Sequence, residues 1–422
     1  MTIRISRRTA LGGLSGSLAL GAFGTGAQAQ AQAPQTIRIA DLEILSGGFA
    51  ILGETNARSI EAGVEEWNNR PGQAIRYDVR LFDTKGSAQE AQAIFSQIVD
   101  QGIRYMTGGG TSAIVSVLLD QVARHNERNP GQEIIYLNHQ AIDPSFTNER
   151  CGFWHFRFDP HVYQRMEALT RFLADDRQVK SAYLVNQDYN FGQQVQASAR
   201  QQLAAKRPDI RIVGEELHPI GRVRDFTPFV TKIKTSGADT VITGNFGPDL
   251  ALLVRAANDI GLTASIYTYY ASLSGTPTAI GEAGANRVRL VTGLDMNALN
   301  PRMSSIYKTF KERHPRLEVM HCAYFDMIEM VGAAAKKAGS IDPGRVARAL
   351  EGLTIEGTFG PVTMRAEDHQ VTAPLFVQTF DKVDGTRIKA GVEGLNLGFR
   401  TERKFAAADT LLAHSCAMRR PS

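Results

Sequence analysis

The sequence predicts an α/β fold of two lobes, each with its own doubly wound, mainly parallel sheet. Three observations predict it: short β-prone segments alternate with amphipathic helical segments from Pro34 onward, the same alternation begins again near Val162, and glycine-rich turns join strand to helix. Strands separated by helices and short turns form right-handed crossovers into a parallel sheet that helices cover on both faces.

The expected elements follow the chain in order. The first lobe is predicted to have strands at 36–42, 75–82, 104–107 and 133–137 and helices at 57–67, 88–98 and 113–126. The second is predicted to have helices at 162–174, 191–205, 226–234 and 249–260 and strands at 181–185, 210–217, 240–243 and 265–269. A β segment at 288–293, helices at 304–313, 323–338 and 344–350, and β segments at 362–364 and 376–380 follow. The last forty residues lack periodicity and are expected to form an extended tail.

The turn Gly108-Gly109-Gly110-Thr111-Ser112 is the strongest candidate for a binding site. A strand that feeds a helix through glycines leaves backbone N–H groups and the positive end of the helix dipole facing the turn. Such a site attracts an anion, and the hydroxyls of Thr111 and Ser112 add donors. We therefore predict a carboxylate-binding site, with a plain tight turn as the alternative.

Nucleotide sites fit this turn poorly. A P-loop needs Gly-Lys-Ser/Thr at the start of the helix, and no lysine lies between Lys85 and Lys180. A dinucleotide fingerprint, G-x-G-x-x-G, is not completed between Gly108 and Ala113. We expect no cofactor.

The first thirty-three residues are predicted to be an export signal and no part of the fold. A twin-arginine run, Ser6-Arg7-Arg8-Thr9-Ala10-Leu11, precedes a glycine-rich apolar segment, and A-x-A sites place cleavage after Ala31 or Ala33. The apolar segment is too short to span a membrane stably, and no later apolar run is long enough. We expect periplasmic localisation without membrane insertion.

Removal of the signal leaves a nearly neutral protein. The chain has 47 basic and 43 acidic residues, and the signal carries Arg4, Arg7 and Arg8 without an acid, which leaves 44 against 43. With no basic stripe, a nucleic-acid partner is not expected. Nearly four hundred remaining residues suffice for two cores.

Three cysteines are too few for a disulfide scaffold and lack the spacing of a metal site. Cys151 and Cys416 lie in polar, loop-like sequence, and in an oxidising compartment we expect them to pair and tie down the C-terminal tail. Cys322 lies within an apolar helical pattern, which favours a buried thiol.

The turns that follow the predicted strands are where a ligand would bind, because open α/β sheets bind ligands beyond the carboxyl ends of their strands. In the first lobe these turns are rich in small donors, and in the second they are rich in aromatic residues, which suits a ligand with an anionic head and an apolar body. The aromatic residues Tyr189, Phe191, Phe246 and Tyr270 have the alternative of being ordinary core residues.

Enzymatic patterns are missing from the sequence. It contains no G-x-S-x-G elbow, no H-E-x-x-H and no cysteine in a catalytic setting. His139, His155 and His161 do not match a zinc pattern, and no carboxylate completes a ligand set. We expect neither a catalytic residue nor a metal site.

Several short segments, in their order and spacing, resemble the periplasmic solute-binding proteins of ABC importers of the branched-chain amino acid type, the leucine-binding-protein-like family. The residues that carry the resemblance are Leu45-Ser46-Gly47, Gly108 to Ser112, Asp188-Tyr189-Asn190-Phe191-Gly192, Asp225-Phe226, Gly237-Ala238-Asp239, Ala323-Tyr324-Phe325-Asp326, and Arg365 to Gln370. The resemblance covers nearly the whole mature chain.

The resemblance implies the type I periplasmic binding protein fold, with lobes that close on a ligand and three hinge strands. We place the crossings near 156–158, 288–292 and 358–361. Lobe I then comprises 34–156 with 293–357, lobe II comprises 157–292 with 358–383, and 384–422 form the tail. The implied function is a monomeric binding subunit that delivers a small carboxylate to a membrane permease.

In the family, a serine at the position of Ser112 holds the ligand carboxylate together with nearby backbone amides. From the resemblance and the strand ends, we predict seven ligand-binding residues: Ser46, Thr111, Ser112, Gln140, Tyr189, Phe246 and Tyr270.

Three positions depart from the family pattern. Ile142 stands where amino-acid-binding members have a threonine, Tyr270 stands where they have the acid that receives the ligand ammonium, and Phe246 stands where a tyrosine is common. A buried ammonium without a carboxylate is costly to desolvate. We therefore expect an organic or aromatic acid without an α-amino group. An amino acid is the alternative if Glu43, Glu54 or Asp83 reaches the cleft.

Two other functions stay open at this point. A ligand-sensing subunit on the same fold would work with a membrane receptor instead of a permease. An exported enzyme would need a cofactor motif, which the sequence does not show.

Overall fold

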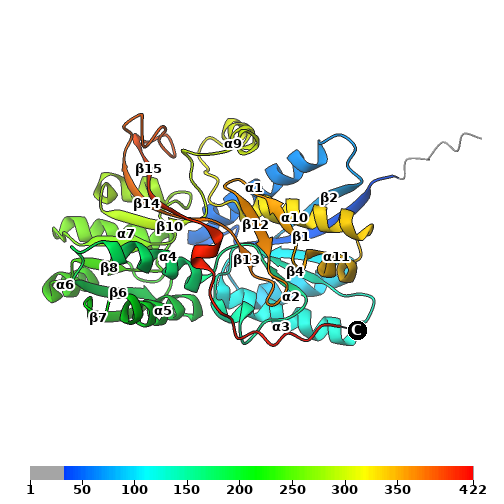
Figure 1. The fold of residues 1–422 in the computed structure, drawn as a ribbon, viewed down its shortest axis with the longest axis horizontal. Helices are drawn as coiled ribbons and strands as arrows, with labels where there is room; N and C mark the ends of the chain where they lie inside the picture. The colour runs from blue at the N-terminus through cyan, green and yellow to red at the C-terminus, as the bar shows by residue number, and fades with distance from the viewer. Residues whose placement is uncertain (1–32, 422) are drawn as a thin grey trace, which may run out of the picture. The chain divides into compact units, whose positions relative to one another are not determined.

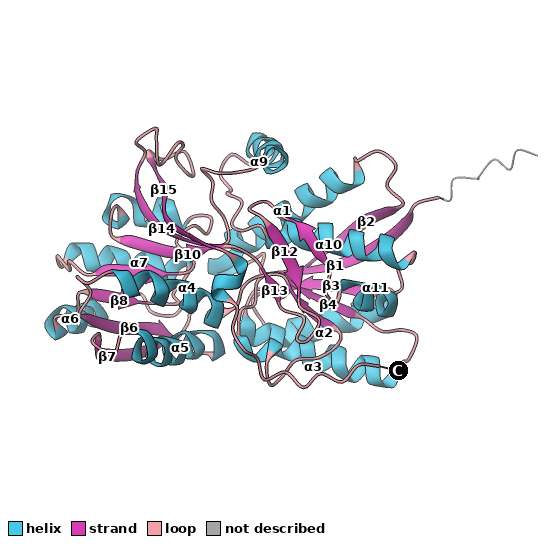
Figure 2. Ribbon diagram, in the orientation of Figure 1, coloured by secondary structure: helices cyan, strands magenta, loops and turns pink. Residues whose placement is uncertain are grey.

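The computed structural model describes residues 33–421. The predicted export signal, apart from Ala33, and the cleavage site after Ala31 lie outside the described residues. Within the described part of the chain, no helix is both long and apolar enough to cross a membrane. Figure 1 shows the order of the elements, and Figure 2 shows helices covering the sheets.

The first sheet is entirely parallel, in the order β2-β1-β3-β4-β5. Its strands are β1 (Gln35–Glu43), β2 (Ile75–Asp83), β3 (Tyr105–Gly108), β4 (Ile135–Asn138) and β5 (His155–Arg157). The helices that cover it are α1 (Ala50–Asn68), α2 (Ala88–Asp100), α3 (Ser112–Arg128), α10 (Ala323–Ala338) and α11 (Pro343–Leu350).

Alternate residues of β1 face the two layers of helices. Ala40 and Leu42 pack with apolar residues of α2 and α3, whereas Ile37 and Ile39 pack with residues of α1, α10 and α11. Because the side-chain period of a strand is two, the next two residues on the second face are Asp41 and Glu43. This alternation carries two acids into the interior, and both are fully buried.

The second sheet is mixed, in the order β15-β14-β10-β9-β8-β6-β7. Its strands are β6 (Ser181–Gln187), β7 (Arg211–His218), β8 (Thr240–Ile242), β9 (Ser265–Thr268), β10 (Val288–Thr292), β14 (Leu375–Lys382) and β15 (Leu397–Phe405). Its helices are α4 (Val162–Asp175), α5 (Asn190–Lys206), α6 (Thr227–Ser236), α7 (Gly247–Asp259) and α8 (Thr276–Ile280). Helices α4 and α5 pack on one face, and α6 and α7 pack on the other.

The remaining elements belong to neither of these two sheets. They are α9 (Pro301–Arg313), the antiparallel strands β11 (Thr354–Glu356), β12 (Pro361–Met364) and β13 (Val371–Thr372), and the 3-10 turns η1 (Gly47–Phe49), η2 (Pro144–Thr147), η3 (Gly281–Gly284) and η4 (Ala407–Thr410).

The C-terminal segment departs from the sequence prediction. Residues 397–405, expected within an extended tail, form β15, which pairs antiparallel with β14 at the edge of the second sheet. The sequence of this segment shows no apolar–polar alternation, because it carries the charged residues Arg400, Glu402 and Arg403. Edge strands often carry such charges. Arg400 forms an ion pair with Asp381 of β14 at 2.8 Å.

For the third crossing between the sheets we propose a later position than the one expected from the sequence. Val362, Met364 and Val371 are buried in the same apolar cluster as Ile37 and Ile39 of the first sheet. The chain joins the second sheet only at Leu375. We therefore propose that the crossing lies at 373–374 instead of 358–361.

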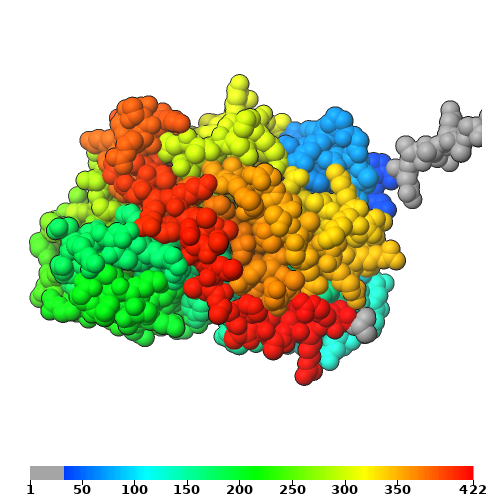
Figure 3. Space-filling view, viewed as in Figure 1, coloured from blue at the N-terminus to red at the C-terminus, as the bar shows by residue number. Residues whose placement is uncertain are grey.

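The last residues leave the second sheet and run along the surface beside elements of the first (Figure 3). A disulfide joins Cys416 to Cys151, the pair expected from the sequence, and the backbone N–H of Ser415 donates to Asn148 Oδ1 at 3.0 Å. Cys322 is a buried free thiol, and burial raises its pKa.

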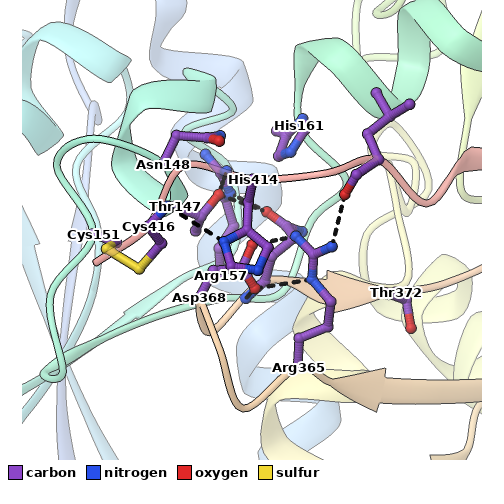
Figure 4. A network of polar contacts seen from close by, with 12 residues as sticks. Thr147, Asn148, Cys151, Arg157, His161, Arg365, Asp368, Thr372, His414 and Cys416 are labelled. Atoms are coloured by element: carbon purple, nitrogen blue, oxygen red, sulfur yellow. Dashed lines mark hydrogen bonds and ion pairs between the residues drawn. A yellow bond between two sulfur atoms is a disulfide. The ribbon is translucent and has the colours of Figure 1, made fainter. Parts of the chain in front are cut away.

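A buried polar cluster lies next to this tail (Figure 4). Arg365 binds the carboxylate of Asp368 and donates to the carbonyl of Leu412 in the tail at 3.0 Å. The fully buried Arg157 donates to the side chain of Gln370 at 2.5 Å, and its pKa is lowered to about 9 because burial disfavours the charge. The cluster holds β5, the segment before β13 and the tail together.

Candidate functional site

A cavity of about 70 Å³ lies where the carboxyl ends of strands from both sheets meet. At roughly 10–15 Å³ per water, this is room for about five to seven water molecules, which suits a small solute and not a peptide or nucleotide. Its lining residues are Glu43, Ile44, Phe49, Leu52, Gly53, Asn56, Gly110, Thr111, Ser112, Gln140, Ile142, Asp159, Tyr189, Phe191, Phe246, Tyr270, Leu273, Met320 and His321.

The glycine-rich turn forms one end of the cavity. Gly109 and Gly110 have φ of +111° and +81°, and a Cβ on Gly110 would lie 2.5 Å from the side chain of Ile44, so that only glycine fits. Thr111 is the N-cap of α3, and its Oγ1 accepts from the N–H of Ile114 at 3.3 Å. Ser112, 4% exposed, is the first residue of the helix and lines the cavity. This end is suited to an anion.

Glu43 is the acidic group next to that end. Its Oε2 accepts from Asn56 Nδ2 at 2.9 Å, and its Oε1 lies 3.3 Å from Gln140 Nε2. Burial raises the pKa of Glu43 to about 8, although both amides favour the charged form. A carboxyl group in this state takes a charge when a cation arrives beside it.

Gln140 connects Glu43 with the glycine turn. In one orientation its amide nitrogen donates to Glu43, and in the other its oxygen accepts from the N–H of Gly110 at 2.8 Å. One side chain therefore reaches both Glu43 and the glycine turn.

Two buried groups lie behind Glu43. His139 Nε2 is 3.3 Å from Glu43 Oε1, and its Nδ1 is 2.6 Å from Thr107 Oγ1. Burial lowers the pKa of His139 to about 4, so this imidazole is neutral at pH 7. Burial raises the pKa of Asp41 well above its usual range, and neither of its carboxylate oxygens has a hydrogen-bond partner among the described residues.

Asp159 is the second acid in the lining. Arg165 binds it through two hydrogen bonds of 2.7 and 2.8 Å, with both side chains buried. The guanidinium therefore balances the charge of Asp159. The pKa of Asp159 is nevertheless raised, because the effect of burial is larger than the opposite effect of the ion pair. The uncompensated acid in the lining is Glu43.

Aromatic side chains form the other wall. The rings of Phe49 and Phe246 have centroids 5.3 Å apart, and Tyr270 lies 5.9 Å from both Phe191 and Phe246. Tyr189 is 5.8 Å from Phe191. Phe49 follows β1, whereas the others follow strands of the second sheet, so the wall is apolar and built from both sheets.

The structure brings together most of the predicted site residues. Thr111, Ser112, Gln140, Tyr189, Phe246 and Tyr270 all line the cavity. Ser46 does not: it is exposed and hydrogen-bonds with Asp83. The prediction for Ser46 is corrected: its side chain hydrogen-bonds with Asp83, in the turn between Ile44 and Phe49, which both line the cavity.

Sequence reasoning missed Asn56, Asp159 and His321, and it named Glu43 only as a condition. Glu43 had a usable signal, since it is the last residue of β1 and shares the face of Ile37 and Ile39. Asp159 and His321 lie in connections without periodicity, and only the folded chain places them here. Glu54 and Asp83 do not line the cavity.

No group of three or more side chains suited to hold a metal ion occurs among residues 33–421.

A family model described as "Periplasmic binding protein" matches residues 36–386, most of the chain. This chain belongs to the periplasmic binding protein family. It is a solute-binding protein of the ABC-transporter type, and membership of the family implies a periplasmic location.

Relatives of this periplasmic binding protein are described as binding proteins. Leu/Ile/Val-binding protein homolog 4 of Brucella abortus (strain 2308) is 28% identical over 400 residues, covering 92% of this chain and 94% of the relative. The closed form of the leucine-, isoleucine-, valine-, threonine- and alanine-binding protein from Brucella ovis is 26% identical, with a TM-score of 0.83 and coverage of 92% and 100%.

A third similarity concerns the fold alone. The solute-binding protein from Rhodopseudomonas palustris BisB5, solved with 3,4-dihydroxybenzoic acid, is 17% identical, with a TM-score of 0.75 and coverage of 88% of this chain and 98% of that one. The expected type I periplasmic binding protein fold is confirmed.

Proposed function

We propose that this protein binds a small α-amino acid with an apolar side chain in the cavity between its two sheets and delivers it to the membrane permease of an ABC importer. The observation that carries the proposal is that one cavity is lined both by a helix N-terminus that suits an anion and by a buried carboxyl group without a cation of its own. The N-terminus of α3 at Thr111 and Ser112 suits a carboxylate, and the carboxyl group of Glu43 suits an ammonium.

This ligand differs from the one expected from the sequence. The expectation of an acid without an amino group rested on Tyr270 replacing the family's ammonium-binding acid. Glu43 lines the cavity without a cation of its own, which removes that reason. The amino-acid ligands named for the Brucella ovis protein point the same way.

An aromatic acid is the second candidate. The wall formed by Phe49, Phe191, Phe246 and Tyr270 would stack on a benzoate ring. A benzoate brings no cation to Glu43. Glu43 would therefore stay protonated, and the benzoate would bind beside a neutral carboxyl group.

We propose that the ligand is taken up by closure of two lobes about crossings near 156–158, 288–292 and 373–374. We further propose that a twin-arginine signal exports the protein and that it acts as a monomer, without catalysis. A receptor in place of the permease would make it a sensing subunit. Co-purification of the mature protein with membrane components distinguishes the two.

Calorimetric titration of the mature protein against L-leucine, L-valine, L-alanine and benzoate tests the ligand class. We expect saturable binding of at least one amino acid and weaker or no binding of benzoate. Benzoate binding with no response to the amino acids would overturn the proposal in favour of the second candidate. Mass spectrometry of small molecules released on denaturation gives an independent reading.

A further inference from the structure

The hydrogen bonds around Glu43 and His139 favour one proton between these two side chains. The hydroxyl of Thr107 donates its one hydrogen to the carbonyl of Leu137. We therefore assign a hydrogen to His139 Nδ1, which lies 2.6 Å from the same oxygen and donates to it in this tautomer; Met327 Sδ, 3.5 Å from the hydroxyl, is a much weaker acceptor than the carbonyl. In a neutral imidazole this leaves Nε2 as an acceptor.

The acceptor Nε2 faces an oxygen of Glu43. The two atoms are 3.3 Å apart, and both side chains are buried, with 0% of His139 and 1% of Glu43 exposed. With no hydrogen between them, two acceptors at this distance would repel each other in an interior of low dielectric, even when Gln140 Nε2 donates to the same Glu43 oxygen from the side at 3.3 Å. A proton on Glu43 Oε1 turns the contact into a hydrogen bond, while Oε2 still accepts from Asn56 Nδ2.

The groups around Glu43 do not supply a cation. The titratable groups that face Glu43 or its buried neighbours come from every surrounding element. They are Asp41 on the same strand, Glu61 on α1, Tyr136 on β4, His139 after β4, Asp159 after β5, His321 before α10 and Tyr324 within it. His321 is kept neutral by burial, which lowers its pKa well below the usual range. Arg165 is committed to Asp159.

We propose that Glu43 is a proton-coupled specificity residue, which exchanges the proton shared with His139 for the ammonium group of the ligand. The O–H bond of Glu43 breaks, the proton leaves to solvent, and the carboxylate pairs with the ammonium, which keeps its three hydrogens. This inference rests on the proposed function and adds a rule for selection. A ligand with an amino group releases one proton on binding, and a carboxylate without one releases none.

Proton release is measured by titration calorimetry of L-leucine into the mature protein at pH 6.5 in phosphate and in Tris, since the observed enthalpy varies with the ionisation enthalpy of the buffer. We expect close to one proton released per leucine. The number should fall toward zero above pH 9, because the pKa of Glu43 is about 8 and the free protein is then already ionised.

Two comparisons sharpen the test. 4-Methylpentanoate, which is leucine without its amino group, should bind with no proton release. The variant E43Q should release none and should bind leucine at least about tenfold more weakly, through loss of a charge-assisted hydrogen bond. The matched control D326N removes another buried acid with a raised pKa, of about 7, outside the cavity, and should keep the release.

The outcomes separate the two claims. Leucine binding without proton release in the unmodified protein would overturn this inference and leave the proposed function standing. If neither leucine, valine nor alanine binds, the proposed function fails and this inference fails with it. If E43Q does not fold, the proton count of the unmodified protein across pH decides the question alone.

Discussion

Arg165 of α4 binds both carboxylate oxygens of Asp159 at 2.7 and 2.8 Å, and the pair lies beside the ring of Tyr270, 5.5 Å from the guanidinium carbon. Arg165 also donates to the carbonyl of Val291 in β10 at 2.8 Å. One buried guanidinium thus fixes the connection after β5, the end of β10 and an aromatic residue of the cavity. Through these contacts, the Arg165 side chain links the proposed crossing near 156–158 to the one near 288–292.

Removing Arg165 should destabilise the fold strongly. R165M leaves Asp159 buried without its cation, and breaking a buried pair costs about 3–5 kcal/mol. The measurement is chemical denaturation followed by far-UV circular dichroism. The control R171M, on the same helix, removes an arginine that is 48% exposed and pairs with Glu167 at 2.7 Å. It should cost less than about 1 kcal/mol. Equal losses in the two variants would contradict the role of the buried pair.

Ser112 should contribute to ligand affinity. Its hydroxyl lies at the N-terminus of α3 in the cavity lining, where it can donate to a carboxylate. S112A should weaken binding by about 1–3 kcal/mol, the usual contribution of one charge-assisted hydrogen bond, as measured by calorimetric titration. S96A, an exposed serine on α2, should leave the affinity unchanged. An unaltered affinity in S112A would remove this residue from the site.

Stability should depend on pH through Glu43. Its pKa in the folded protein is about 8 against an ordinary 4.5, so the folded state binds the proton more tightly than the unfolded state. The contribution to stability is complete below pH 4.5 and is lost as the pH rises toward 8. His139, with its pKa lowered to about 4, acts in the opposite direction, since its contribution is lost as the pH falls from 6.5 to 4.

E43Q isolates the first of these effects. It removes the ionisable group, so its free energy of unfolding should fall less between pH 5 and pH 8 than that of the unmodified protein, by roughly 3–5 kcal/mol. Denaturant titrations at both pH values give the difference. Parallel pH profiles for the two proteins would show that Glu43 ionises freely in the folded state.

The order of strands and helices was predictable from the sequence, because it follows from the local spacing of apolar residues. Helix α10 begins and ends at the predicted residues 323 and 338, and α3, predicted at 113–126, spans Ser112–Arg128. Residues 397–405 escaped prediction because an edge strand buries only part of its length and carries charges that disguise the alternation. Pairing with β14, a tertiary interaction, makes that segment a strand.

The candidate site was predictable where it depends on strand ends and not where it depends on packing between distant elements. Thr111, Ser112 and Gln140 follow strands of the first sheet, and rules about sheet edges find them. Asn56 reaches the cavity from α1, and His321 reaches it from the connection before α10. Their positions depend on how helices pack on the sheet, which no local pattern encodes.

The disulfide should stabilise the protein by fastening the tail. It joins residues 265 apart in sequence, and beyond it Arg420 forms an ion pair with Glu351 at 2.7 Å. The double variant C151S/C416S should lose about 2–4 kcal/mol of unfolding free energy, because the cross-link restricts the unfolded chain. Thermal or denaturant unfolding measures the loss.

The same variant should free the end of the tail for proteolysis. With the cross-link removed, the segment from Leu411 onward keeps only exposed and half-buried hydrogen bonds, so trypsin should cut faster after Arg419. A reductant should reproduce both effects in the unmodified protein and change nothing further in the double variant. Leucine affinity, measured beside them, should stay the same, since neither cysteine lines the cavity. A loss of affinity without a loss of stability would mean that the tail acts on lobe closure.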